Sequence, residues 1–73
     1  MAQVTVKRGV GTAVVRTYGV VRDMLNDTAL WQFLGADPAA SQIAVSGQPV
    51  GADQALLDGD VLEVRDVSHE KGN

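Results

Sequence analysis

Polar and apolar residues alternate at the start of the chain, and this alternation predicts a β-hairpin. Two valines alternate with polar neighbours over residues 3–7, which is the period of a strand with one buried face. Residues 12–18 are rich in β-branched side chains and predict a second strand, in which we expect Arg16 to point to solvent. Gly9 and Gly11 lie between the two runs and permit the positive φ angles of a tight turn.

Beyond the hairpin, the apolar spacing changes to the three- and four-residue repeat of a helix packed by one face. Asp27 is a suitable cap for a new turn, so the segment forms either one helix with a break or two short helices, and Gly35 ends it. Trp31 and Phe33 either fill the core or form a recognition patch, and a regular helix cannot turn both to the same side. The repeat comprises Val21, Met24, Leu25, Thr28, Leu30, Trp31, Phe33 and Leu34.

The second half of the chain predicts further short strands separated by turns. Residues 42–46 are expected to form the third strand, residues 47–49 a turn, and Val50 the start of a short fourth strand. Residues 58–60 form a tight turn into the last strand, over residues 61–67.

These elements predict an α+β domain of order β-β-α-β-β, with a mixed sheet of four to five strands and one main helix packed on one face. The first and last strands are expected to lie parallel at the sheet centre. We expect Asp37 to cap a helical turn that begins with Pro38, and Leu56 and Leu57 to pack beneath the sheet. The domain spans residues 1–67, followed by a flexible tail.

The formal net charge of −3 is divided unevenly along the chain. The first 36 residues carry four cations and two carboxylates, whereas the remainder carries seven carboxylates and two cations. The C-terminal half is therefore expected to repel nucleic acid, and either to remain a solvated acidic surface or to attract a basic protein surface.

The chain contains no cysteine, which excludes disulfides, a thiolate nucleophile and cysteine-ligated metals. No basic head leads into an apolar run at the N-terminus, and no stretch reaches membrane-spanning length. We therefore expect a cytoplasmic protein that does not bind a membrane. No nucleophile–base set or metal-ligand spacing is present, so we expect no enzymatic activity, no cofactor and no metal.

Three segments of the chain carry a resemblance to a known family. They are residues 19–25 at the helix start, residues 43–50 at the third strand and its turn, and residues 57–64 at the turn into the last strand. Together they resemble the β-grasp, or ubiquitin-like, superfamily, and within it the small sulfur-carrier proteins of thiamin and molybdopterin biosynthesis. The resemblance covers nearly the whole chain and implies a ubiquitin-like β-grasp fold.

The resemblance also implies a carrier whose C-terminal carboxylate is activated by an ATP-dependent enzyme, then converted to a thiocarboxylate or joined to an amine. Members of the family end in Gly-Gly, whereas the tail over residues 68–73 contains only Gly72, followed by Asn73. Gly72 is thus the candidate attachment residue, either after proteolytic removal of Asn73 or through an activating enzyme that accepts this tail.

Two functions follow from these observations. The first is a non-catalytic protein-interaction module that binds another protein through its exposed sheet face or its acidic last strand, or by edge pairing. The second is a sulfur carrier or protein modifier, whose partner is an activating or sulfur-transfer enzyme. The oligomeric state is left open. The candidate partner-binding residues are Glu63, Arg65, Asp66, His69 and Glu70.

Overall fold

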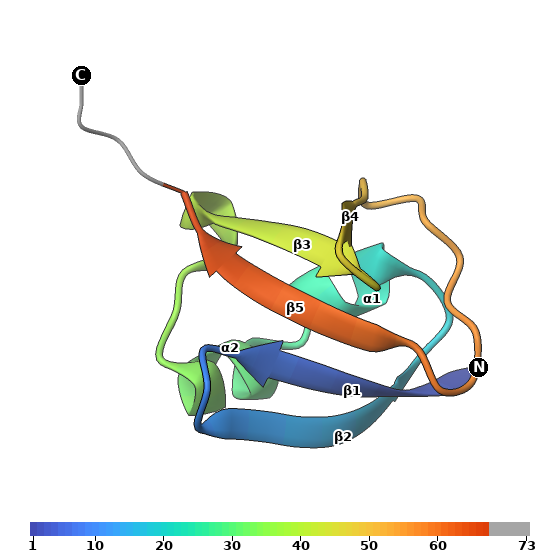
Figure 1. Ribbon diagram of the computed structural model, residues 1–73, viewed down its shortest axis with the longest axis horizontal. Coiled ribbons are helices and arrows are strands. Elements are labelled where there is room, and N and C mark those ends of the chain that lie inside the picture. The colour runs from blue at the N-terminus through green and yellow to red at the C-terminus, as the bar shows by residue number, and fades with distance from the viewer. Residues whose placement is uncertain (68–73) are drawn as a thin grey trace.

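The computed structural model describes residues 1–67 and shows a five-stranded mixed sheet with helical segments on one face (Figure 1). The strand order is β2-β1-β5-β3-β4, with β1 and β5 parallel at the centre. The strands are β1 (Ala2–Arg8), β2 (Thr12–Tyr18), β3 (Ser41–Val45), β4 (Gln48–Pro49) and β5 (Val61–Asp66). The helical segments are α1 (Val21–Leu25), α2 (Thr28–Leu34) and the 3₁₀ turn η1 (Pro38–Ala40). The predicted α+β architecture is confirmed, and the predicted tail lies outside the described residues.

The hairpin of β1 and β2 pairs along its whole length, from Ala2 opposite Tyr18 to Arg8 opposite Thr12. Because partners across a ladder share a face, Arg16, opposite Val4, lies on the helix side of β2. It is half-buried there and donates a hydrogen bond from Nη1 to the carbonyl of Val15 (2.9 Å). The expectation that Arg16 points to solvent is therefore wrong.

The helix is broken into two at Asp27, as one of the two alternatives predicted. The Asp27 carboxylate caps α2 by accepting from the amide of Leu30, and it also accepts from the hydroxyl of Tyr18 at 2.8 Å. The indole of Trp31 donates across the break to the carbonyl of Met24 at 3.0 Å. Gly35 ends α2 in the left-handed conformation, with φ 69°, as expected of a helix stop.

The two aromatic residues of α2 face opposite environments. Trp31 is 4% exposed within the core, whereas Phe33 is 56% exposed on the helix surface. Of the two predicted alternatives, core filling therefore applies to Trp31 alone. Trp31 belongs to a single hydrophobic core whose members come from the strands, the helices and the loop before β5: Ala2, Val4, Val6, Tyr18, Val21, Met24, Leu30, Leu34, Ile43, Leu56, Leu62 and Val64.

Two predictions in the second half are wrong in detail. Leu56 is buried, but Leu57 is 71% exposed, because it belongs to a turn in which its amide donates to the carboxylate of Asp60. The turn after β3 is made by Ser46 and Gly47, which both have positive φ (52° and 84°), and β4 therefore begins two residues before Val50. The predicted cap of η1 by Asp37 is confirmed.

The buried hydroxyl of Tyr18 is expected to make the fold less stable at alkaline pH. Burial, followed by the hydrogen bond to Asp27, raises the pKa of Tyr18 above its ordinary value of 10.0. Above pH 10 the unfolded chain therefore loses this proton while the folded chain keeps it, so the free energy of unfolding should fall. Tyr18→Phe should abolish this component and cost about 1 kcal/mol at neutral pH through the lost hydrogen bond.

Urea denaturation at a series of pH values, followed by the fluorescence of the sole tryptophan, measures this dependence. Both proteins contain the same lysines, so their titration cancels in the comparison. Equal slopes for the two proteins between neutral and strongly alkaline pH would contradict the assignment.

Candidate interaction surface on the sheet

One face of the sheet is covered by the helices, and the other is open: α1 and α2 lie behind the sheet in Figure 1. The alternating burial of the strands and their register decide which side chains reach the open face. We call this set the open face: Gln3, Thr5, Lys7, Ala13, Val15, Thr17, Gln42, Val61, Glu63 and Arg65.

A row of apolar atoms crosses the centre of the open face. Thr5 lies opposite Val15 on one side and beside Val61 on the other, so the three side chains are neighbours across three strands. Val15 is 53% exposed and Val61 is 39% exposed. β-Branched side chains at these positions lose little rotamer freedom on contact with a partner, because their strands already restrict χ1.

The charged residues of the open face lie in the next rows along the sheet. Lys7 stands beside Glu63 in the register of β1 and β5. Arg65 donates from Nε and Nη2 to the same oxygen of Glu63, at 3.0 and 2.7 Å, and so neutralises it. Within residues 1–67, Lys7 forms no ion pair. The open face therefore carries a net positive charge on an acidic protein.

The acidic residues are used mainly in turns and helix caps. Each of the eight carboxylates between residues 1 and 67 accepts a hydrogen bond from within the chain. Four accept hydrogen bonds from backbone amides, and three pair with arginines. The eighth, Asp27, caps α2 and also accepts from the hydroxyl of Tyr18. The set is Asp23, Asp27, Asp37, Asp53, Asp58, Asp60, Glu63 and Asp66.

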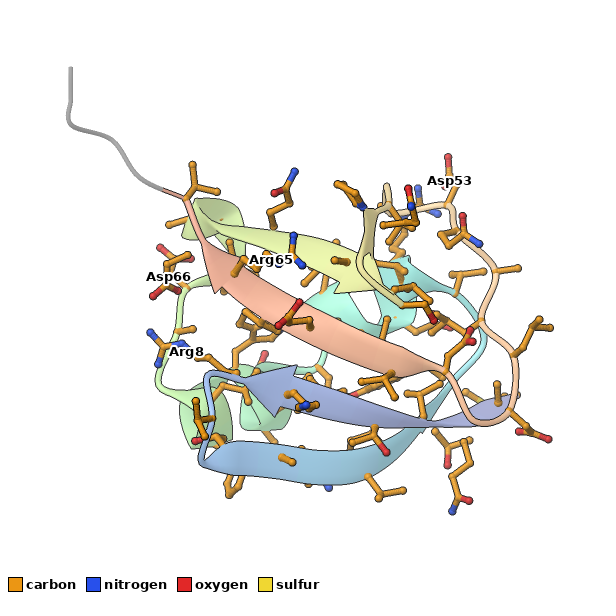
Figure 2. The ribbon with its side chains drawn as sticks, in the orientation of Figure 1. Arg8, Asp53, Arg65 and Asp66 are labelled. Carbon is orange, nitrogen blue, oxygen red and sulfur yellow. The ribbon has the colours of Figure 1, made fainter. Side chains whose placement is uncertain are left out.

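The structure separates the predicted partner-binding residues. Glu63 and Arg65 lie together on the open face, as Figure 2 shows for the labelled Arg65 on β5. Asp66 points to the other side of β5 and pairs with Arg8 at 3.0 Å. The remaining candidates, His69 and Glu70, and the candidate attachment residue Gly72 lie outside the described residues.

Arg8 ties three elements together at the end of the sheet where β5 finishes. Its Nη1 donates to the carbonyl of Leu34 at 2.8 Å and to that of Gly35 at 3.3 Å, which are orphan acceptors at the end of α2. Its Nη2 bonds to Asp66, and the two labelled side chains meet at this edge in Figure 2. Asp66 is therefore part of a structural clamp, and its role in partner binding stays a prediction.

The helix side carries a shallow groove of about 330 Å³. None of its lining residues is titratable, so the groove offers no acid, base or metal ligand. Among residues 1–67, no three acidic or histidine side chains gather in a way that could hold a metal, and no helix is long and apolar enough to cross a membrane. The lining consists of Leu25, Thr28, Trp31, Gln32, Gly35, Ala36 and Pro38.

The fold is shared with ubiquitin and its relatives. A protein designed de novo on the basis of ubiquitin matches with a TM-score of 0.72 and 14% identity, over 99% of this chain and 95% of that one. Ubiquitin of Caldiarchaeum subterraneum matches with a TM-score of 0.66 and 11% identity, over 96% of this chain and 98% of that one. The N-terminal ubiquitin-like domain of the 4931431F19Rik protein matches with a TM-score of 0.69 and 18% identity, over 99% of this chain and 80% of that one.

No protein-family model and no curated protein matches the chain by sequence. The structural likeness at these low identities shows the fold alone: the chain has the ubiquitin-like β-grasp fold. The resemblance to the superfamily is thereby confirmed at the level of fold, and the finer resemblance to sulfur carriers stays a prediction.

Val15 and Val61 at the centre of the open face, and Lys7 at its border, were not among the predicted partner-binding residues. The signal was present in the alternation of β1, β2 and β5, which places these residues out of phase with the residues that face the helices. What was missing was the register, because only the pairing of β1 with β5 brings Lys7 beside Glu63 and Thr5 beside Val61.

The Arg8 clamp should contribute more to stability than the arginine pair on the open face. Arg8→Met removes two bonds to helix-end carbonyls as well as the partly exposed ion pair with Asp66, and should cost about 1–2 kcal/mol. Arg65→Met removes only an exposed pair and should cost about 0.5 kcal/mol or less. Urea denaturation compares the two variants, and equal losses would show that the carbonyl bonds contribute nothing.

Proposed function

We propose that this chain is a non-catalytic interaction module that binds another protein through the open face of its sheet. The observation that carries the proposal is the row of Val15, Thr5 and Val61 at the centre of the open face, where both valines are exposed and neither α1 nor α2 covers them. The opposite face of the sheet packs against α1 and α2 and forms the core.

The composition of the open face supports a protein partner. The centre of a protein interface is apolar and its rim is polar, and here the apolar row is bordered by Lys7, Glu63 and Arg65. The face also consists of regular strands, whose side chains are held by the sheet before a partner arrives, so little conformational entropy is lost on binding.

The charges of the open face select the kind of partner. Glu63 is already satisfied by Arg65, whereas Lys7 is exposed and forms no ion pair within residues 1–67. A carboxylate of the partner placed over Lys7, beside apolar groups over Val15 and Val61, would complement this arrangement. An acidic partner surface is thus expected instead of a basic one, because each carboxylate between residues 37 and 67 already serves a turn, a cap or an ion pair.

Site-specific photo-crosslinking in the native cells tests the open face. A photo-reactive residue at Val61 should give a discrete crosslinked product, whereas the same residue at Phe33, exposed on the helix side, should not. In the Val61 protein, Lys7→Glu should reduce the product about tenfold, because one like-charge contact in an interface costs on the order of 1–2 kcal/mol.

Circular dichroism establishes that each variant is folded. Gln32→Glu, which adds a negative charge on α2 away from the open face, is a control for a general effect of charge, although it changes the charge by one unit and Lys7→Glu changes it by two. Equal crosslinking at Val61 and Phe33, or no effect of Lys7→Glu, would overturn the assignment of the open face.

The second candidate function is a carrier or modifier that acts through Gly72. What supports it is the ubiquitin-like fold, together with the anchoring of the end of β5: Arg8 binds Asp66, and the amide of Val67 donates to the carbonyl of Ala40 at 2.9 Å. A firmly held strand end presents the residues that follow it to an activating enzyme from a defined point. In this function the partner is an ATP-dependent activating or sulfur-transfer enzyme.

Deletion of Gly72 and Asn73 separates the two functions. The carrier requires the C-terminal residues, so the deletion should abolish any thiocarboxylate or conjugate detected by intact mass of the protein isolated from native cells. Open-face crosslinking at Val61 should persist in the same variant. Loss of the crosslink on deletion, with the fold intact, would place the binding site in the tail instead.

A further inference from the structure

The two edges of the sheet are unequal, and one of them is suited to pairing with another strand. The edge at β4 contains only two residues and ends in Pro49, which has no amide to donate. The edge at β2 is seven residues long and contains neither proline, glycine nor lysine. Proline and charged side chains, lysine above all, normally protect exposed edges from pairing, and Arg16 is the one charged residue of β2. Of the two edges, β2 is therefore the one open to strand addition.

The hydrogen-bond pattern identifies which groups of β2 face outward. The amide of Thr5 donates to the carbonyl of Asp60 at 3.0 Å, so Thr5 directs its backbone groups toward β5. Backbone direction alternates along a strand, so Val4 and Val6 direct theirs toward β2, where they pair with Arg16 and Val14. The alternate residues of β2 then direct their amides and carbonyls away from the sheet: Ala13, Val15 and Thr17.

This outward row is complementary to itself. When two copies of β2 run antiparallel with Val15 opposite Val15 of the second copy, Ala13 lies opposite Thr17, and the three residues exchange six backbone hydrogen bonds. Arg16 is the only charged residue of the strand, and in this register it lies opposite Val14 rather than the other Arg16. The two valines at the symmetry axis also form a β-branched pair on the open face, which favours association.

We infer that two copies of this chain associate through β2 into a symmetric dimer with a continuous ten-stranded sheet. The interface is small, because one strand edge from each copy falls below the standard interface size. The dissociation constant is therefore expected on the order of 0.1 mM. The two open faces then lie side by side, so a bivalent partner meets both at once. This inference does not rest on the proposed function, because the edge pairs without any third protein.

Arg16 limits the association. Its Nη1 donates a hydrogen bond of 2.9 Å to the carbonyl oxygen of Val15, which is one of the three outward acceptors. Pairing in the dimer requires this intramolecular bond to be released or shared. Arg16→Ala frees the acceptor and should strengthen dimerisation several-fold, which no general destabilisation of the strand would do.

Sedimentation velocity and an NMR concentration series of the full chain test the dimer. The apparent mass should rise from 7.7 kDa toward twice that value as concentration increases, with shift changes and slowed amide exchange confined to Ala13, Val15 and Thr17 on the outward edge. Val15→Pro removes one outward amide and no bond to β1, so it should weaken association at least tenfold while the monomer stays folded.

Val15→Lys provides a second test, because it places like charges at the symmetry axis and should also weaken association at least tenfold. Val61→Lys is the matched control, since it adds the same charge to the open face away from the edge and should leave association unchanged. A protein that stays monomeric to millimolar concentration, or a dimer indifferent to Val15→Pro, overturns the inference. In either case the open-face crosslink at Val61 is unaffected, so failure of the dimer and failure of the proposed function are distinguishable.

Discussion

The parallel pairing of β1 with β5 is the contact on which the rest of the structure depends. It joins the first strand to the last, from Thr5 beside Val61 to Arg8 beside Val64, and it brings together four core side chains that are at most 3% exposed: Val4, Val6, Leu62 and Val64. Because this pairing closes a loop of more than fifty residues, it forms only when the intervening chain is ordered. The hairpin, the helices and the Arg8 clamp all gain their stability from it.

The same pairing defines the surfaces of the molecule. It sets one face of the central strands against α1 and α2, and it leaves the other face with Lys7 beside Glu63 and a row of β-branched side chains. The carboxylates that make the protein acidic are distributed around this frame, where they cap helices and hold turns. The open face carries a net positive charge on a chain of net negative charge because most of the described carboxylates lie in turns and helix caps.

Val15 connects the two surfaces that the structure offers to partners. Its side chain contributes to the open face, and its backbone groups point outward from the edge of the sheet, because alternation in a strand couples the direction of the side chain to that of the backbone groups. The open face and the β2 edge are thus adjacent surfaces. A partner on the open face would contact the side chain of Val15, whereas a strand at the edge would bond to its backbone amide and carbonyl.

The sequence by itself determined the elements whose signals are local. The alternation around Val4 and Val6, the cap at Asp27 and the stop at Gly35 depend on neighbours within a few residues, so the α+β order and the break in the helix could be predicted. Tertiary structure decided what depends on register between distant segments. These features are the position of Arg16 on the helix side, the exposure of Leu57, the pairing of Asp66 with Arg8, and the meeting of Lys7 with Glu63. Register is set by the packing of the whole core, because a shift of one residue would turn every buried side chain of a strand to solvent.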